Sequence, residues 1–549
     1  MKRVKTILTV MLLGCTSAAQ AADVKTNGNQ VTIRPDGGQA KVIRLEVIND
    51  NIIRVRATSK DELPAKAQSL MIVPQQPYKG AVTVQETEAG GSGTQSASVY
   101  VKAKNVWARV SKASGHVQFF DGNGKTLLKE AGESPATEPG KQFWDFTVPE
   151  RELGAKGGAA VSEEQKHGLQ WQLKFCSPPG SESFYGLGQH QSEEFNMRGK
   201  NEDLFQYNTK VSIPFVLSTK NYGLLWDAYS YCRFGSPKDY LQLNRAFRLY
   251  DRLGNPGHLT GTYIDKDGRK LVRDEDSIYF EYGYPDTSEI ARKTDNGGIK
   301  NLPQGFNLDG ANVVYEGFIE PRDNAQCSMH NAQCSMLNAQ CTMLNAQCSM
   351  HNAQSTADNA QCTMHNAQST ADGKDCALCT EHCALSIEHC ALYQFILYYA
   401  GYIKVYIDGK EVVPERWRTA WNPNAYKFEC RLQPGRKAQL RIEWQPDGGE
   451  SYCGLRVAEP RSDNDRESLS IWCEMARDMD HYFIAGQSMD DVISGYRTLT
   501  GRASLYPKWA LGFWQSRERY KTSGEIEETL AEFRRRHIPI DNIVQDWNY

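Results

Sequence analysis

A chain of 549 residues with 40% hydrophobic content is long enough for two or more domains with ordinary globular cores. Its net charge of −3 argues against nucleic acid or an anionic membrane surface as an electrostatic partner. Aromatic residues are plentiful, with 11 Trp and 26 Tyr, which fits sugar-stacking surfaces as well as it fits sandwich cores.

Residues 1–21 are typical of an export signal. Basic side chains among the first five residues precede the apolar run 7–13, and residues 19–21 read Ala-Gln-Ala, a small-x-small cleavage site. In an alternative interpretation, Cys15 closes a lipoprotein box and becomes a lipidated N-terminus. No other apolar run reaches transmembrane length. The sequence therefore predicts an exported protein, periplasmic or on the outer surface, with no membrane span.

Residues 22–283 are predicted to form an N-terminal β-sandwich. Stretches such as 42–47 and 52–56 alternate apolar and polar side chains, and Gly, Asp and Asn turns separate them. Many short antiparallel strands at this spacing indicate two packed sheets.

Residues 284–470 are predicted to form a second β domain, which a repeat interrupts at 324–390. A strand over 402–410 runs into an Asp-Gly turn. The repeat has the seven-residue unit Asn-Ala-Gln-Cys-Ser-Met-Leu, whose Ala, Cys and Met are weak coiled-coil seam residues. The codons AAT-GCT-CAA-TGC-TCA-ATG-CTC encode this unit as copies of AATGCTC. The repeat is therefore interpreted as a tandem DNA array that is read in frame.

Cysteine usage gives no clear framework, because nine of the fifteen cysteines lie in the repeat and another is Cys15. One or two disulfides could form in an oxidising compartment, but the sequence does not fix their pairing. Cys376 and Cys379, with His382 nearby, have the spacing of a zinc site. The nucleotide array generates the same positions, so no metal and no cofactor is predicted. The remaining cysteines are Cys176, Cys232, Cys430, Cys453 and Cys473.

Residues 471–505 are expected to return to the sandwich and to link it to the next domain. Three carboxylates, Glu474, Asp478 and Asp480, precede an apolar strand there. Paired carboxylates are what glycoside hydrolysis needs, but these lie before the domain junction. They are interpreted as a solvated strand edge.

Residues 506–549 predict the opening unit of a parallel (β/α)8 barrel. A buried strand with a polar tip over 506–520 is followed by an amphipathic helix over 524–536 and a second apolar strand that ends at Asp546. Such barrels place their active sites at the C-terminal ends of the strands. Asp546 is therefore predicted to contact substrate, with Trp547 as a pocket wall; the alternative for Asp546 is a strand-end cap. At most two of the eight strands are expected in this sequence.

Several motifs, in order along most of the chain outside the repeat, resemble glycoside hydrolase family 31. The segments that carry this resemblance are 184–189 (Phe-Tyr-Gly-Leu-Gly-Gln), 213–218, 222–227, 482–486, 496–501, 507–512 and 538–546. The family fold implies a galactose-mutarotase-like sandwich before the barrel. Residues 284–470 resemble a PA14 module, and a PA14 module in this place resembles the family's α-xylosidases, which trim xyloglucan side chains.

The resemblance also implies roles for single residues. Asp546 matches the aspartate that holds hydroxyls of the sugar in the −1 subsite, and Trp547 matches the neighbouring wall. Glu518 stands where the family often has a pocket aromatic, which is a departure. Asn208 corresponds to a loop residue that the sandwich lends to the active site. Both catalytic aspartates of this retaining family are expected beyond Tyr549, since no Trp-x-Asp-Met-Asn-Glu-type motif occurs here.

The sequence is therefore interpreted as a fragment, itself inactive, of a retaining exo-acting α-glycosidase. Its full-length relative is expected to be an α-xylosidase whose partner is a xyloglucan-type oligosaccharide or polysaccharide. Two alternatives remain open: a non-catalytic carbohydrate-binding surface protein, and the product of a disrupted gene with exposed strand edges.

Overall fold

The structure is a computed structural model in which most of the chain outside the repeat is described. The described residues are 23–65, 68–88, 97–132, 140–147, 167–178, 180–190, 192, 194–206, 210–235, 239–280, 303, 306–322, 392–419, 425–448, 451–461 and 468–546. The predicted export signal, the repeat 324–390 and its candidate zinc ligands, Asn208 and Trp547 lie outside them. Within these ranges, strands dominate and no helix has the length and apolar character needed to cross a membrane.

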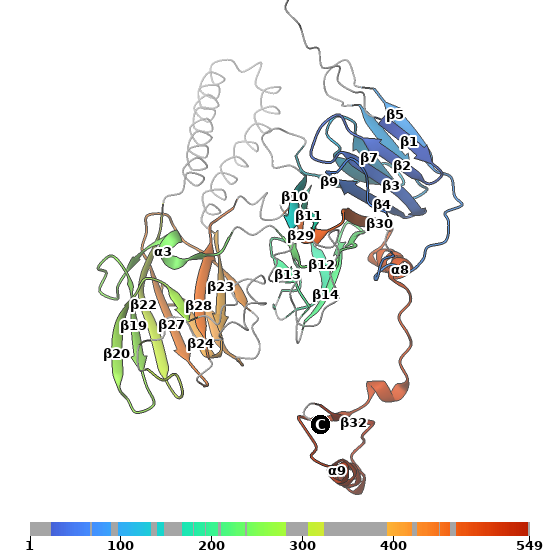
Figure 1. The fold of residues 1–549 in the computed structure, drawn as a ribbon. Coiled ribbons are helices and arrows are strands. Elements are labelled where there is room, and N and C mark those ends of the chain that lie inside the picture. The colour runs from blue at the N-terminus through green and yellow to red at the C-terminus, as the bar shows by residue number, and fades with distance from the viewer. Residues whose placement is uncertain are drawn as a thin grey trace, which may run out of the picture.

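Two β-sheets pack face to face in the N-terminal sandwich (Figure 1). The first sheet runs β1 (Asp23–Asn27), β2 (Gln30–Arg34), β3 (Val42–Asn49), β4 (Ile52–Thr58), β30 (Met479–Ala485), β15 (Tyr222–Trp226), β14 (Val211–Ser218) and β12 (Phe184–Gln189). The second runs β13 (Glu202–Leu204), β16 (Cys232–Phe234), β29 (Leu469–Ala476), β11 (His167–Cys176), β9 (Thr126–Glu130), β8 (Val117–Asp121), β7 (Val106–Ser111), β6 (Ser98–Lys102) and β5 (Thr83–Thr87), with β10 (Lys141–Thr147) beside β11.

The alternating sequence pattern explains this packing. In β2, Val31 and Ile33 are buried while the residues between and beside them are half-exposed. One apolar core joins the two sheets, and Phe119 of the second sheet stacks on Phe483 of the first with ring centroids 4.1 Å apart. The side chains of alternate residues therefore meet in a single layer between the sheets.

The Phe-Tyr-Gly-Leu-Gly-Gln motif is β12, and its glycines permit a close approach to β14. Gly188 has φ +97°, and a Cβ there would lie 1.9 Å from the carbonyl oxygen of Val211. A Cβ on Gly186 would lie 2.6 Å from the carbonyl oxygen of Phe215. The pairing register shifts between the two glycines. Glycine is required here because any side chain would collide with the neighbouring backbone.

The second β domain also consists of two sheets around its own core. One sheet runs β17 (Leu241–Gln242), β28 (Cys453–Ala458), β23 (Leu392–Tyr399) and β26 (Tyr426–Arg431), with β21 (Ile278–Phe280) beside β28. The other runs β20 (Lys270–Glu275), β19 (Leu259–Ile264), β22 (Asn312–Pro321), β27 (Ala438–Gln445), β24 (Gly401–Ile407) and β25 (Lys410–Arg418), with β18 (Phe247–Tyr250) beside β22. A short helix, α3 (Leu243–Ala246), precedes β18.

The sheet pairing places the boundary between the two β domains earlier in the chain than the expected position, residue 283. Strands β17 to β21 lie in the second domain's sheets, so the chain leaves the sandwich after β16 and not near 283. It returns at β29 and β30, each of which lies between two earlier strands of a sandwich sheet. The alternating pattern alone could not place this boundary, because strands on both sides of it are antiparallel and half-buried.

The C-terminal segment forms a β-α-β unit after helix α8 (Met489–Thr500) and a short 3-10 helix, η2 (Lys508–Leu511). Strands β31 (Trp514–Arg517) and β32 (Asn542–Gln545) pair in parallel, and α9 (Ser523–Arg535) connects them. The predicted helix and the predicted parallel strands are confirmed. The fold class is therefore mainly β with one β-α-β unit, and no closed barrel is present in the described residues.

The predicted burial of the first strand is wrong in this structure. Trp514 is 46% exposed, and Phe513 and Leu511 before it are 47% and 78% exposed. Within the described residues this parallel sheet has only two strands, and α9 contains no buried side chain. Parallel strands are normally covered on both faces, and an apolar sequence is typical of such strands. Two strands and one helix do not provide this cover, so the apolar side chains of this strand are exposed here.

Candidate functional site

The carboxyl ends of β31 and β32 lie at one edge of the parallel sheet. Arg517 and Gln545 are register partners at these ends. Glu518 and Asp546 each follow directly, and both are exposed. The structure therefore brings Glu518 and Asp546 to the same edge of the sheet. Trp547 and Asn208, the other two predicted substrate contacts, lie outside the described residues.

The loop after β31 is fastened to the end of β32 by a reciprocal pair of hydrogen bonds. The backbone N–H of Tyr520 donates to Gln545 Oε1 at 3.1 Å, and Gln545 Nε2 donates to the carbonyl oxygen of Tyr520 at 3.2 Å. Tyr520 itself is buried. Sequence reasoning did not single out Gln545, although its place one residue before Asp546 was a signal. The bonds hold the backbone beside Glu518 against the strand that presents Asp546.

The opposite end of the unit is fixed as well. Asp541 Oδ2 accepts a hydrogen bond from the backbone N–H of Phe513 at 3.2 Å, and the N–H of Asp541 donates to the carbonyl oxygen of Phe513 at 3.0 Å. At the carboxyl end, where α9 begins, Thr522 caps the helix by accepting from the N–H of Glu525 at 3.2 Å. The two strands thus keep their relative position at both ends, which leaves the edge with Asp546 as a preformed surface.

Asp478 and Asp480 lie in a buried ion-pair cluster of the sandwich and not at a solvated edge. Asp480 Oδ1 accepts from Arg54 Nε at 2.8 Å, and Arg54 Nη2 makes a second contact with the same carboxylate. Asp478 Oδ2 accepts from Arg56 Nε at 2.7 Å. The predicted solvated edge is wrong because β30 lies between β4 and β15 inside the sheet. Glu474, at the same sequence cluster, is half-buried.

The electrostatics of this cluster follow from its burial. Burial raises the pKa of Asp480 to about 6, although the hydrogen bond and charge of Arg54 oppose that shift. Burial likewise raises the pKa of Asp478, against the opposing charge of Arg56. A cavity of about 740 Å³ adjoins the cluster, with Asp227 also in its wall. Since both aspartates are bonded to arginines, they are not a free acid and nucleophile pair for hydrolysis.

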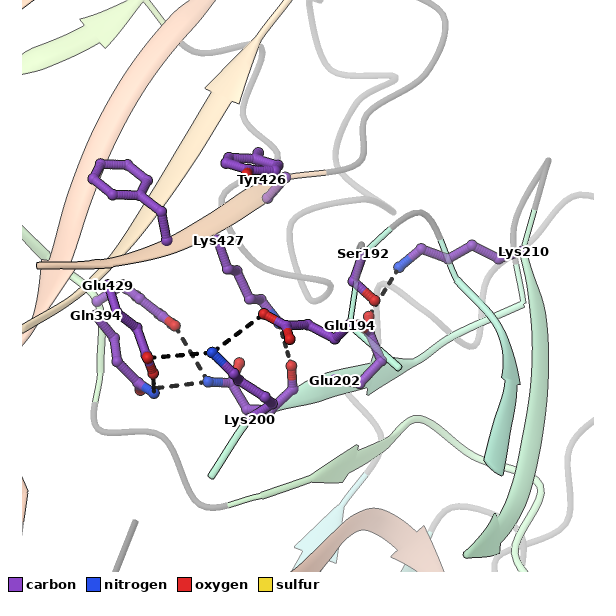
Figure 2. A pocket seen from close by; sticks show the side chains of 13 residues that line it. Ser192, Glu194, Lys200, Glu202, Lys210, Gln394, Tyr426, Lys427 and Glu429 are labelled. Atoms are coloured by element: carbon purple, nitrogen blue, oxygen red, sulfur yellow. Dashed lines mark hydrogen bonds and ion pairs between the residues drawn. The ribbon is translucent and has the colours of Figure 1, made fainter. Parts of the chain in front are cut away.

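A second cavity, of about 70 Å³, lies between the sandwich and the second β domain and is rich in charge (Figure 2). Lys200 of the sandwich reaches Glu429 of β26 and Glu194, with both Nζ–Oε distances at 3.2 Å. Lys427, also on β26, donates to the carbonyl oxygen of Asn201 at 3.0 Å. This volume has room for a few water molecules and not for a sugar ring.

Asp203 also lies at this contact between the sandwich and the second β domain, next to Lys427. Burial alone would raise its pKa, but the charges of Lys427 and Arg233 and a hydrogen bond from Tyr231 hold it to about 2. The carboxylate is therefore ionised throughout the physiological range. Sequence reasoning missed these groups because Asp203 and Lys427 are far apart in the chain and neither lies in a motif.

No group of three His, Cys, Asp or Glu side chains that could hold a metal ion occurs in the part of the chain that the structure describes. The sheet edge offers two exposed carboxylates, those of Glu518 and Asp546. Carboxylate oxygens accept hydrogen bonds from hydroxyls, which is the chemistry of saccharide recognition.

Parts of the chain are similar to known protein families and to known proteins. Residues 42–234 match the glycosyl hydrolase 31 N-terminal galactose mutarotase-like domain, and residues 503–549 match the glycosyl hydrolases family 31 TIM-barrel domain. The α-xylosidase of Saccharolobus solfataricus is 56% identical over 84 residues, which are 15% of this chain and 12% of that protein. α-Glucosidase 2 of Bacillus thermoamyloliquefaciens is 45% identical over 71 residues, 13% of this chain and 9% of that protein.

A solved structure extends the likeness over nearly the whole chain. The family-31 α-xylosidase of Xanthomonas citri superposes with a TM-score of 0.69 at 31% identity, covering 96% of this chain and 45% of that one. The chain therefore spans less than half of that protein and about a tenth of the two curated relatives. These matches show that residues 42–234 are similar to the N-terminal domain, and residues 503–549 to a part of the TIM-barrel domain, of glycoside hydrolase family 31.

Proposed function

We propose that this chain belongs to a retaining exo-acting α-glycosidase, and specifically to an α-xylosidase acting on xyloglucan-type oligosaccharides. The observation that carries the proposal is the 31% identity to a solved α-xylosidase over 96% of this chain. That likeness includes the second β domain as well as the sandwich and the β-α-β unit. The 56% identity of an 84-residue segment to another α-xylosidase supports the same substrate class.

Asp546 is the residue we propose as the main substrate contact within these 549 residues. It is exposed at the end of β32, where its carboxylate oxygens can accept hydrogen bonds from sugar hydroxyls. Glu518 lies at the same edge as a second acceptor, with Trp547 and the loop residue Asn208 as further contacts. None of these four side chains is assigned the role of nucleophile or acid.

Binding of a xyloglucan oligosaccharide to the 549-residue chain, measured by isothermal titration calorimetry, tests this assignment. We expect Asp546→Asn to weaken binding at least tenfold, because a sugar hydroxyl would lose a charged acceptor. Glu527→Gln, at an exposed position of α9, is the matched control and should bind as the parent does. Equal affinity of the parent and Asp546→Asn would contradict the assignment.

The 549-residue polypeptide is proposed not to hydrolyse glycosides by itself. In the described residues the only adjacent carboxylate pair that sequence reasoning singled out, Asp478 and Asp480, is bonded to Arg56 and Arg54. An assay of residues 22–549 with p-nitrophenyl α-xyloside should show no turnover. Measurable release of p-nitrophenol, abolished by Asp546→Asn, would overturn this part of the proposal.

A second candidate function, carbohydrate binding without catalysis, is supported by a pair of exposed aromatics on the second β domain, which the sequence likens to a PA14 module. Tyr402 and Trp417 are register partners on β24 and β25, and they are 44% and 55% exposed. The indole N–H of Trp417 donates to Asp447 Oδ2 at 2.9 Å, which orients the ring. Flat exposed rings of this kind stack on sugar faces.

Affinity electrophoresis in gels that contain xyloglucan separates the two candidates. If the second domain binds polysaccharide, Trp417→Ala should lose retardation. Trp144→Ala, which removes an exposed ring from β10 of the sandwich, is the matched control. Retardation that persists in Trp417→Ala but disappears in Asp546→Asn would assign binding to the sheet edge alone.

Export is proposed from the sequence of residues 1–21. The mass of the secreted protein decides between cleavage after residue 21 and lipidation of Cys15. Sequencing of the locus tests the remaining alternative, a disrupted gene, because the tandem-array interpretation of 324–390 requires seven-base repeats in the DNA.

A further inference from the structure

Two cysteines on neighbouring strands face each other inside the sandwich. Cys232 on β16 and Cys473 on β29 are register partners in an antiparallel pair. The adjacent pair, Tyr231 and Glu474, exchanges a backbone hydrogen bond, with the Glu474 N–H donating to the Tyr231 carbonyl oxygen at 2.9 Å. Because hydrogen-bonded and non-hydrogen-bonded pairs alternate, the cysteines occupy a non-hydrogen-bonded pair, in which the Cα atoms are about 4.5 Å apart.

That spacing suits a disulfide, whose Cα atoms are usually about 4.4–6.8 Å apart. Directly opposite residues of an antiparallel pair point to the same face of the sheet. Cys232 is 2% exposed and Cys473 is 0% exposed, and both belong to the apolar core between the sheets. The thiol of Cys473 and burial together raise the pKa of Cys232 well above its ordinary value.

None of the other three described cysteines lies opposite another described cysteine in the sheet register. Cys430 and Cys453 lie on opposite sides of β23, where their register partners are Tyr393 and Tyr399. These partners are six positions apart, which corresponds to about 20 Å along a strand. Cys176 is exposed at the end of β11. Of the five cysteines in the described ranges, only Cys232 and Cys473 are register partners of each other.

We propose that Cys232 and Cys473 form a cross-strand disulfide. Two S–H bonds break and one S–S bond forms, and the two protons and two electrons pass to a disulfide oxidant such as oxidised glutathione, which becomes two thiols. The bond would join the strand from which the chain leaves the sandwich to the strand on which it returns. The whole second β domain lies in the closed loop, so the disulfide would clamp the base of that domain.

Peptide mapping of the full chain tests the proposal directly. The protein is refolded in a glutathione redox buffer, its remaining thiols are alkylated under denaturing conditions, and the digest is analysed by mass spectrometry without reduction. We expect a linked peptide pair that contains Cys232 and Cys473 and that disappears after treatment with dithiothreitol. Recovery of both cysteines in alkylated form from the oxidised, folded protein would overturn the proposal. Mapping also separates this bond from any that the repeat's cysteines form.

Two variants make the result specific. Cys430→Ser should leave the linked pair unchanged, whereas Cys232→Ser should abolish it and leave Cys473 alkylated. Dithiothreitol should lower the thermal unfolding midpoint of the oxidised parent and leave that of the Cys232→Ser, Cys473→Ser double variant unchanged. An equal response of parent and double variant would contradict a clamping role. If the double variant fails to fold, the map of the parent protein still decides whether the bond forms.

Discussion

Arg54 and Asp480 form a two-point ion pair across neighbouring strands of the sandwich, although 426 positions separate them in the chain. Both side chains are almost fully buried, with exposures of 5% and 9%. Arg54 has a second acidic neighbour, Glu46, at 3.6 Å. The pair joins β4, an early strand of the chain, to β30, which leads into α8. Loss of this pair is therefore expected to destabilise the first sheet.

Replacing Asp480 by Ala should lower the free energy of unfolding by about 3–5 kcal/mol, because it leaves the Arg54 guanidinium buried without its main partner. Urea unfolding monitored by circular dichroism measures the change. Lys41→Ala removes the exposed ion pair with Asp61 and should cost less than about 1 kcal/mol. A cost for Asp480→Ala no larger than that of the control would contradict the importance of the buried pair.

The stability should also depend on pH through Asp480. Its pKa is about 6 in the folded protein and near 3.9 in the unfolded chain, so the folded state binds the proton more tightly. The stabilisation from this proton is complete below about pH 4 and is lost as the pH rises through about 6, by roughly 3 kcal/mol at most. The difference in unfolding free energy between the parent and Asp480→Asn, measured from pH 4 to 7, should show this slope. A pH-independent difference would exclude it.

Lys427→Met should loosen the contact between the two β domains. The substitution keeps the aliphatic stem but removes the hydrogen bond to the Asn201 carbonyl and the charge beside Asp203. Hydrogen exchange should rise several-fold in β13 and β26 while the core of each domain keeps its protection. Lys410→Met, at an exposed position of β25, is the control. Unchanged exchange in β13 would mean that this lysine does not hold the interface.

Gln545→Ala should release the loop after β31. Both hydrogen bonds to the Tyr520 backbone disappear, at a local cost of about 1–3 kcal/mol. The amide of Tyr520 should then exchange at least fivefold faster. The control is Gln515→Ala, whose side chain donates to the carbonyl oxygen of the adjacent Ser516 and not to the loop after β31. Equal exchange rates in the two variants would show that Gln545 does not fasten the loop.

Local pattern predicted the elements of this fold well where the residues that decide them are close in sequence. The helix expected over 524–536 is α9, because Thr522 supplies an N-cap just before an amphipathic stretch. Asp546 was placed at a strand end for the same reason: the apolar run Ile543-Val544 ends two residues before it.

Features that depend on distant partners were not predictable in this way. The residues that pair with Asp478 and Asp480 are far from them in the sequence. These partners, Arg54 and Arg56, lie on β4, and the pairing of β4 with β30 became known only from the sheet order. The charges on an otherwise apolar strand, Arg54 and Arg56, were the one available signal. The cysteine pair likewise became visible only through the register of β16 against β29.

The return of the chain to the sandwich at β29 and β30 has a consequence for the order of events during synthesis. Neither sandwich sheet can be completed until these two strands have left the ribosome, after the second β domain has been made. The second domain can fold first. Until β30 is available, the edges of β4 and β15 that pair with it stay unpaired. Folding of the sandwich should therefore be slow and exposed to aggregation, with closure of the first sheet as its late step.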